Sequence, residues 1–220
     1  MACGLLFDMD GVLADTEAII AEATIQMYRD LYGVTLEPKD FLPFVGTGAV
    51  RYTQGPADAA GFAIDLDKAL EVRYDNFVAL LNSGRNITFP GVLDLIDAAY
   101  ASPDWDLAIA TSSPGPKAME TLAAAKIPVE KFTKIISGDM VTHKKPHPEI
   151  YLRAATELGI EPACCAVIED AIEGVKAAKA AGMPCLAVTN TFPREQLFEA
   201  DLVVNSLADV DLQMLCGLLP

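Results

Sequence analysis

The sequence predicts an α/β protein whose core is a doubly wound, Rossmann-like parallel sheet, with an all-helical domain inserted after the first strand. Three observations support this prediction. Short apolar runs alternate with amphipathic stretches from about residue 89 onward, which is typical of βαβ units. A first apolar run, residues 4–7, is separated from the others by a long segment without a convincing strand. Polar residues follow the apolar runs, as expected where ligands bind beyond the carboxyl ends of parallel strands.

The helices and strands can be assigned in order along the chain. After the strand at residues 4–7, a helix is expected over residues 17–32, ended by Gly33, and another over residues 66–81. An amphipathic helix follows Pro90 and Gly91. Later strands are expected at 106–111, 134–137, 164–168, 184–188 and 202–204, and helices at 115–125, 149–158 and 172–181. Residues 1–15 and 89–220 therefore form the predicted α/β core, and residues 16–88 the inserted helical domain.

The composition indicates a globular protein and argues against several classes of partner. With 220 residues, of which 52% are hydrophobic, the chain is long enough to bury a core unaided. A formal net charge of −15 argues against nucleic acid, because phosphate backbones require clustered Lys and Arg. No apolar run approaches the roughly 18 residues of a membrane span, so no membrane insertion is expected. We expect a monomer.

The five cysteines and the N-terminus bear on the cellular compartment. The cysteines form neither a CxxC pair nor a zinc spacing, so we expect buried thiols in a reducing environment. The chain opens on a core strand, so we expect no targeting segment in this sequence. An intracellular protein is predicted, and the cytoplasm and the chloroplast stroma both fit.

Two carboxylates follow the first strand at once. Asp8 and Asp10 come directly after the apolar run and lie on the same side of an extended backbone, because strand side chains alternate. Carboxylates held this close repel each other, and relief comes from a bound cation or a shared proton. A calcium-binding EF-hand loop is excluded, because glycine stands at position four instead of six and no Glu stands at position twelve.

Other polar residues follow the later strands. A helix start preceded by hydroxyl residues offers backbone N–H groups to an anion. Acidic residues supply the oxygen ligands that Mg²⁺ prefers, and a lysine can offset the charge of a phosphoryl group. Together these residues predict a phosphate ester held over Mg²⁺; they are Thr111, Ser112, Ser113, Lys145, Glu169 and Asp170. His143 and His147 are expected to be structural or exposed, and not metal ligands.

Four segments carry a family resemblance. "DMDGVL", "IATSS", "KKPHPEIY" and "VIEDAIEGVKAAKAAGM" resemble the four motifs of the haloacid dehalogenase-like hydrolase superfamily. The branch they resemble contains β-phosphoglucomutases and sugar phosphatases with a helical cap, and the stretch "DFLPFVGTGAVRYTQG" is most similar to plant and algal plastid-type members. The resemblance implies an aspartyl-phosphate mechanism on a small phosphorylated metabolite. It assigns these roles: Asp8 as nucleophile, Asp10 as general acid/base, Thr111 as phosphate-binding hydroxyl, Lys145 as motif lysine, and Asp8, Asp10, Glu169 and Asp170 around Mg²⁺.

The inserted domain supplies further candidates for substrate binding. Gly46, Gly48 and Arg51 are expected in a small loop before a helix, where Arg51 could meet an anionic substrate. A plain interhelical turn with a solvated arginine is the alternative. Arg73 matches the basic cap position of sugar-phosphate relatives, and Glu17 could hydrogen-bond a substrate hydroxyl or simply cap a helix. Ser112 and Ser113 complete the candidates on the core side.

Two departures from the family favour hydrolysis over isomerisation. β-Phosphoglucomutases carry a histidine where this chain has Ile20. Their cap-loop arginine is displaced here, with Ala49 at the corresponding place and Arg51 two residues later. We therefore predict a Mg²⁺-dependent phosphatase acting on a small phosphorylated metabolite, with phosphosugars favoured. A phosphosugar mutase is the first alternative, and a regulatory, partner-binding domain with little turnover is the second.

Overall fold

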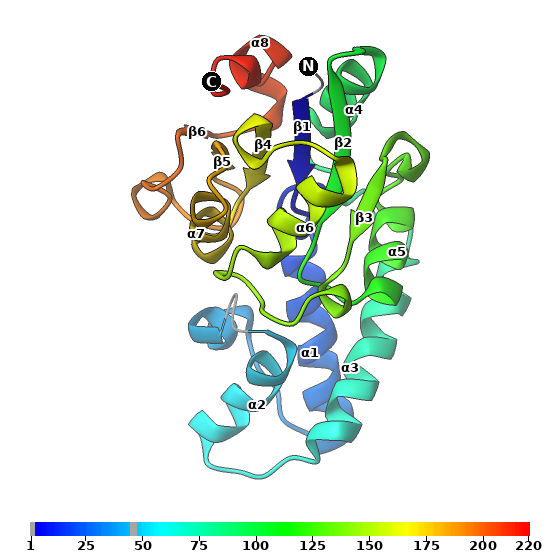
Figure 1. Ribbon diagram of the computed structural model, residues 1–220. Helices are drawn as coiled ribbons and strands as arrows, with labels where there is room; N and C mark the ends of the chain where they lie inside the picture. The colour runs from blue at the N-terminus through cyan, green and yellow to red at the C-terminus, as the bar shows by residue number, and fades with distance from the viewer. Residues whose placement is uncertain (1–2, 45–47) are drawn as a thin grey trace. The chain divides into compact units, whose positions relative to one another are not determined.

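The computed structural model describes residues 3–44 and 48–220, and the chain divides into two compact units. One unit, Met1–Asp15 with Asn86–Pro220, contains the sheet. The other, Thr16–Arg85, is built from helices alone in its described part (Figure 1). None of the helices in the described residues is long and apolar enough to cross a membrane.

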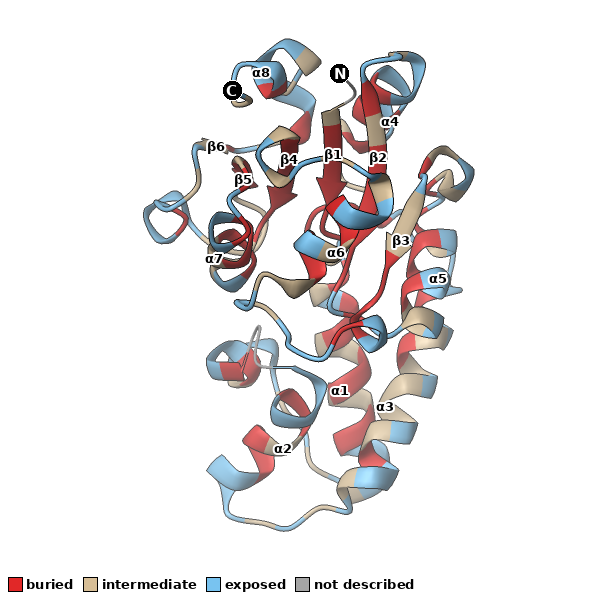
Figure 2. Ribbon diagram, viewed as in Figure 1, coloured by how far each residue is buried: buried red, intermediate tan, exposed pale blue. Residues whose placement is uncertain are grey.

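The sheet has six parallel strands in the order β3-β2-β1-β4-β5-β6, which confirms the predicted fold class. The strand order reverses between β1 and β4, and such a switch point is where ligands bind in doubly wound sheets. The central strands of the sheet are buried on both faces, as Figure 2 shows, because helices cover parallel sheets on both sides. The strands are β1 (Cys3–Phe7), β2 (Trp105–Ala110), β3 (Lys134–Ile136), β4 (Cys165–Glu169), β5 (Cys185–Val188) and β6 (Leu202–Val204).

Helices pack on this sheet through their apolar residues. Tyr151 of α6 and Val175 of α7 belong to one buried cluster with Leu6 of β1, so α6 and α7 cover the same face. Helix α4 contacts β2 and α8. The α-helices of this unit are α4 (Val92–Ala101), α5 (Gly115–Ala124), α6 (Glu149–Leu158), α7 (Ile172–Ala180) and α8 (Leu212–Cys216). Short 3₁₀ turns are η2 (Val129–Lys131), η3 (Gly138–Met140), η4 (Pro162–Cys164), η5 (Arg194–Gln196) and η6 (Leu207–Asp209).

The helical unit is held together mainly by α1 packing against α3. Gly33 ends α1 in the left-handed conformation, with φ 65°, as its position predicted. The buried Tyr28 hydroxyl donates to the Thr53 carbonyl over 2.5 Å and accepts from the Ala57 N–H over 3.2 Å, which ties α1 to α2. The elements are α1 (Glu17–Tyr32), η1 (Pro38–Phe44), α2 (Ala49–Ala60) and α3 (Leu66–Leu81).

One prediction about this unit was wrong. Arg51 lies inside α2 and not in a loop before a helix, because the helix already begins at Ala49. Gly55 and Pro56 within α2 argue against a helix by propensity. Packing overrides that propensity, since Gly55 lies against the Phe44 ring so closely that a Cβ there would be 2.4 Å from a ring carbon.

The prediction of buried cysteines holds only for two thiols. Cys165 and Cys185 are buried inside the sheet. Cys3 and Cys164 are half-buried, and Cys216 on the C-terminal helix α8 is exposed. An apolar neighbourhood in sequence therefore does not ensure burial where a strand or helix begins or ends.

Candidate active site

The ends of β1 and β4 bring three carboxylates together. Phe7 is paired with Ile168, and the pairing continues one residue further because the Asp8 N–H donates to the Ile168 carbonyl over 3.0 Å. Glu169 ends β4 and Asp170 follows it. Asp8, Glu169 and Asp170 are 7%, 1% and 2% exposed, and each offers an oxygen within 4.8 Å of the others. We refer to these three residues as the acidic cluster.

Lys145 reaches into the acidic cluster from the loop between β3 and α6. Its ammonium donates to Asp8 Oδ1 over 2.5 Å and to Glu169 Oε1 over 2.7 Å. The same ammonium lies 4.8 Å from the ring centroid of Tyr151. The side chain is only 9% exposed, so this double ion pair forms in a nearly water-free environment. Lys145 thus bridges two of the residues that the sequence motifs selected.

Glu169 has both carboxylate oxygens engaged by the protein. Oε1 accepts from Lys145 and also from the Tyr151 hydroxyl, the latter over 2.8 Å. Oε2 accepts the backbone N–H groups of Asp170 and Ala171 over 2.8 and 2.9 Å. Gly174 provides the necessary space, because a Cβ there would be 1.6 Å from Oε1. This arrangement favours an orienting role for Glu169 over direct metal ligation.

The pKa values in the acidic cluster show that its negative charge is incompletely balanced. Burial, together with the Glu169 charge, raises the pKa of Asp8 to about 7 although Lys145 opposes this. Burial and the charges of Glu169 and Asp8 also raise the pKa of Asp170. Burial acts in the same direction on Glu169, but the charge and hydrogen bond of Lys145 outweigh it and lower the pKa of Glu169. A single lysine facing three buried carboxylates leaves room for a divalent cation, and an all-oxygen site suits a hard ion.

Asp10 belongs to a second group of polar side chains, at the end of β2. The Ser113 hydroxyl donates to Asp10 Oδ2 over 2.7 Å. Lys117, the third residue of α5, donates to Ser113 Oγ over 2.9 Å and lies 3.4 Å from Asp10 Oδ1. Thr111 is buried, and its Oγ1 accepts the Ser113 N–H over 3.1 Å, whereas Ser112 is exposed. Of the predicted hydroxyl residues, Ser113 is therefore the one that contacts Asp10.

The predicted anion site at the start of α5 is partly occupied by the chain itself. The Gly115 N–H donates to Asp139 Oδ1 over 3.0 Å. Hydrogen bonds from the Ser137 hydroxyl, 2.6 Å away, and from Gly115 lower the pKa of Asp139. A carboxylate of the chain thus caps this helix end at Gly115, which the sequence interpretation did not anticipate.

Several residues of the site were missed by sequence reasoning. Tyr151 and Lys117 lie on helices whose orientation toward the site cannot be read from a motif. Gly11 has φ 87°, and a Cβ there would be 1.9 Å from Asp170 Oδ2. Asn190 donates to the Gly11 carbonyl over 2.8 Å, so a residue after β5 holds the turn that follows β1. The glycine in "DMDG" was the available signal, since a conformation with positive φ favours glycine.

The predicted basic residues of the helical unit are held within that unit. Arg73 Nε donates to Thr24 Oγ1 over 3.0 Å, and its guanidinium lies 5.7 Å from the Tyr52 ring centroid. Arg51 pairs with Asp58 over 2.8 Å. The role of both arginines in substrate binding stays a prediction.

The remaining candidates of the helical unit are Glu17, Gly46 and Gly48. Glu17 is the first residue of α1. Burial of the Tyr52 hydroxyl raises the pKa of Tyr52, and the negative charge of Glu17 raises it further. Gly48 is the N-cap of α2 with φ 86°. Gly46 lies outside the described residues. For these three residues, too, substrate binding stays a prediction.

Comparison with known proteins identifies related sequences and structures. The sequence profile described as "Haloacid dehalogenase-like hydrolase" matches residues 5–188. The chain is 37% identical over 201 residues to Protein SUPPRESSOR OF QUENCHING 1, chloroplastic, of Arabidopsis thaliana; the match covers 89% of this chain but only 19% of that longer protein. It is 32% identical over 209 residues to the validoxylamine A 7'-phosphate phosphatase of Streptomyces hygroscopicus subsp. limoneus, covering 93% of this chain and 94% of that one. A crystal structure of a CbbY mutant from Rhodobacter sphaeroides in complex with xylulose-(1,5)bisphosphate has a TM-score of 0.81 and 28% identity, covering 95% of this chain and 96% of that one.

Proposed function

This chain belongs to the haloacid dehalogenase-like hydrolase family and is a phosphatase, and we propose that it hydrolyses a small sugar phosphate in a Mg²⁺-dependent reaction. The observation that carries the proposal is the acidic cluster with Lys145 bridging Asp8 and Glu169. We further propose an intracellular monomer. A stromal location is supported by the chloroplast protein among its relatives, and the cytoplasm remains the alternative.

In the proposed mechanism, Asp8 is the nucleophile. The paired Asp8 N–H fixes its backbone at the strand end, and Lys145 holds its Oδ1. Attack on phosphorus forms an aspartyl-phosphate, which divides one difficult displacement into two steps. Lys145 offsets the charge shared between the carboxylate and the phosphoryl group.

Asp10 is the general acid and general base in this proposal. It protonates the leaving oxygen and then removes a proton from the attacking water. Hydrogen bonds from Ser113 and Lys117 hold its carboxylate in one orientation. The residues proposed to hold Mg²⁺ are Asp8 and Asp170 through carboxylates and Asp10 through its backbone carbonyl, with Glu169 orienting the site. When bound, Mg²⁺ would supply positive charge against phosphoryl oxygens.

The test is phosphate release from a panel of sugar phosphates, sugar bisphosphates, phosphoglycolate and nucleotides. Each substrate is measured with Mg²⁺ and with excess EDTA. We expect selective turnover that requires Mg²⁺ and falls at least about a thousandfold in Asp8→Asn, because the nucleophile is lost. Asp104→Asn, the same change at an exposed aspartate of the core unit, is the matched control and should keep full activity.

Other outcomes of this assay would redirect the proposal. Isomerisation of glucose 1-phosphate with little phosphate release would support the mutase alternative. Absence of Mg²⁺-dependent turnover across the whole panel would contradict the proposed function. Capture of a protein partner that is unchanged in Asp8→Asn would then favour the regulatory alternative.

A further inference from the structure

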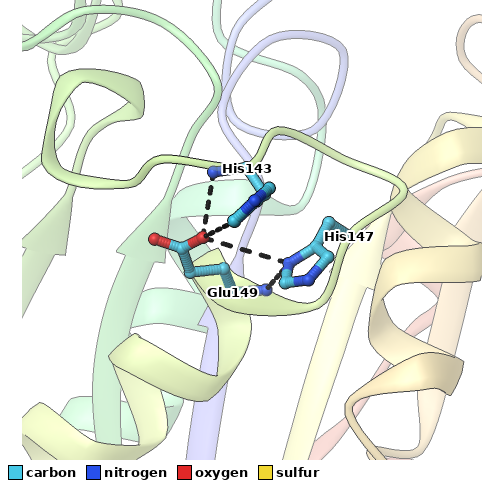
Figure 3. A group of neighbouring side chains, drawn as sticks. All are labelled: His143, His147 and Glu149. Carbon is cyan, nitrogen blue, oxygen red and sulfur yellow. Dashed lines mark hydrogen bonds and ion pairs between the residues drawn. The ribbon is translucent and has the colours of Figure 1, made fainter.

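A second group of potential metal ligands lies on the surface, in the segment that carries Lys145. His143, His147 and Glu149 each offer a ligand atom within 4.8 Å of the others. Their side chains are 63%, 51% and 30% exposed, in contrast to the buried acidic cluster. Figure 3 shows both imidazole rings turned toward the Glu149 carboxylate. The sequence interpretation expected exposed histidines without a metal; they are exposed, but they are not isolated.

The two imidazoles are held beside each other. Their ring centroids are 4.5 Å apart with an interplanar angle of 32°. His143 Nδ1 lies 2.8 Å from Glu149 Oε2, and His147 Nδ1 lies 4.0 Å from the same oxygen. The Glu149 N–H donates to His147 Nδ1 over 3.3 Å, so this nitrogen is unprotonated, as a metal ligand must be. A metal ion at Nδ1 would take the place of that hydrogen bond.

These separations suit a tetrahedral transition metal. Zinc–nitrogen and zinc–oxygen bonds of about 2.0–2.2 Å at tetrahedral angles place neighbouring ligand atoms roughly 3.3 Å apart. The two observed separations of 2.8 and 4.0 Å lie on either side of that value, so shifts of about 0.5 and 0.7 Å would bring both of them to it. Side chains this exposed can make such shifts by small rotations.

Glu149 is the fixed member of the group. It is the first residue of α6, and its two oxygens accept the backbone N–H groups of Thr142 and His143 over 2.8 and 2.9 Å. These bonds fold the segment back onto the helix start and bring His143 next to the carboxylate. The ligand geometry therefore does not depend on the histidines alone.

We propose that His143, His147 and Glu149 form a surface site for a divalent transition metal ion such as Zn²⁺, with its remaining coordination positions open to water. Two imidazoles and one carboxylate favour Zn²⁺, Cu²⁺ or Ni²⁺ over Mg²⁺, whereas the all-oxygen acidic cluster favours Mg²⁺. The formal net charge of −15 attracts cations to the whole molecule. The proposal does not rest on the proposed phosphatase activity.

The site would act on the segment that holds the bridging lysine. Lys145 stands two residues from each histidine, with its ammonium on Asp8 and Glu169. A metal bound to His143, His147 and Glu149 would fasten this segment to the start of α6. The acidic cluster would thus bind Mg²⁺ and the surface group a transition metal ion, and one short segment carries residues that contact both.

The test is a titration of the full chain with Zn²⁺ as the titrant, in a buffer that contains excess Mg²⁺. The chain has two histidines, both in the proposed site, so a His143→Asn/His147→Asn variant contains no imidazole. All five cysteines and the acidic cluster are the same in both proteins, so their contribution to Zn²⁺ binding cancels. We expect the wild type to bind one Zn²⁺ more than the variant, and His147→Asn alone to weaken that binding at least about tenfold.

A second measurement uses the wild-type protein only. NMR signals of the two histidine rings should both shift on addition of one equivalent of Zn²⁺ and return on chelation. Equal Zn²⁺ stoichiometry and affinity in wild type and double variant would overturn the proposal, as would ring signals that do not respond to Zn²⁺. Loss of the additional Zn²⁺ in Asp8→Asn, with both histidines present, would assign it to the acidic cluster and also overturn the proposal.

Discussion

Replacing Gly174 by alanine tests whether the position of Glu169 controls the site. Gly174 is the third residue of α7, where alanine would ordinarily stabilise the helix by about 1 kcal/mol. The structure predicts the opposite. A Cβ at this position would be 1.6 Å from Glu169 Oε1 and 2.0 Å from its Cδ, whereas ordinary contact begins at 3.4 Å.

The carboxylate would therefore have to withdraw by about 2 Å. It cannot do so and keep its bonds to Lys145 and Tyr151, which are 2.7 and 2.8 Å long. Hydrogen bonds to a charged group contribute about 1.5–3 kcal/mol each. Loss of two of them outweighs the gain in helix propensity, so we expect a net destabilisation of about 2–5 kcal/mol.

The assay is urea unfolding, followed by Mg²⁺-dependent phosphate release under conditions where the variant is folded. Gly217→Ala is the matched control, because that glycine has φ −67° and its Cβ would meet nothing closer than 3.4 Å. A Gly174→Ala/Glu169→Asp double variant shortens the displaced side chain and should recover part of the lost stability. A Gly174→Ala protein that is more stable than wild type, with unchanged turnover, would refute this reasoning.

Three further changes have defined expectations. Gly11→Ala places a Cβ 1.9 Å from Asp170 Oδ2 at φ 87°, so the Mg²⁺ concentration for half-maximal activity should rise at least about tenfold, measured by Mg²⁺ titration. Lys117→Met removes a donor 3.4 Å from Asp10, so kcat should fall at least about tenfold and the acidic side of the pH–rate profile should move. The pKa of Asp201 is lowered overall. Burial alone would raise it, but hydrogen bonds from Lys179 and from the Cys185 N–H outweigh burial. This half-exposed carboxylate therefore stabilises the fold above its unfolded pKa of about 3.9. Asp201→Asn should lower the free energy of unfolding by at most about 1 kcal/mol at pH 7 and by less at pH 3, in urea titrations.

The sequence predicted the parts of the site that lie at strand ends. Asp8 and Glu169 follow apolar runs, and the register of neighbouring parallel strands alone brings such residues together. The motif selected Lys145, but the sequence did not predict that its ammonium donates to both Asp8 and Glu169, because the path of the segment between β3 and α6 is not read from a motif.

Residues on helices escaped prediction for a different reason. The spacing of apolar residues in α6 marks Tyr151 as a core residue, and it is fully buried. The same spacing says nothing about its hydroxyl, which reaches Glu169. For the same reason, the sequence interpretation did not single out Lys117. In α2, local propensity was misleading, because the contact between Gly55 and Phe44 is formed only in the folded unit.

A requirement for a cation is expected from the charges of this chain, apart from any relative. Four carboxylates, those of the acidic cluster and of Asp10, face two lysines: Lys145 donates to Asp8 and Glu169, and Lys117 donates to Asp10. When all four carboxylates are ionised, two negative charges are left over among these six side chains. Burial already raises the pKa of Asp8 to about 7 and also raises the pKa of Asp170. A phosphate monoester brings up to about two more negative charges. Its approach is unfavourable unless a divalent cation or protons enter with it. Protonation of Asp8 would disable the proposed nucleophile, and protonation of Asp170 would remove a proposed Mg²⁺ ligand. A cation balances the charge and leaves both Asp8 and Asp170 ionised, so we expect metal dependence from the same carboxylates that are proposed to supply the chemistry.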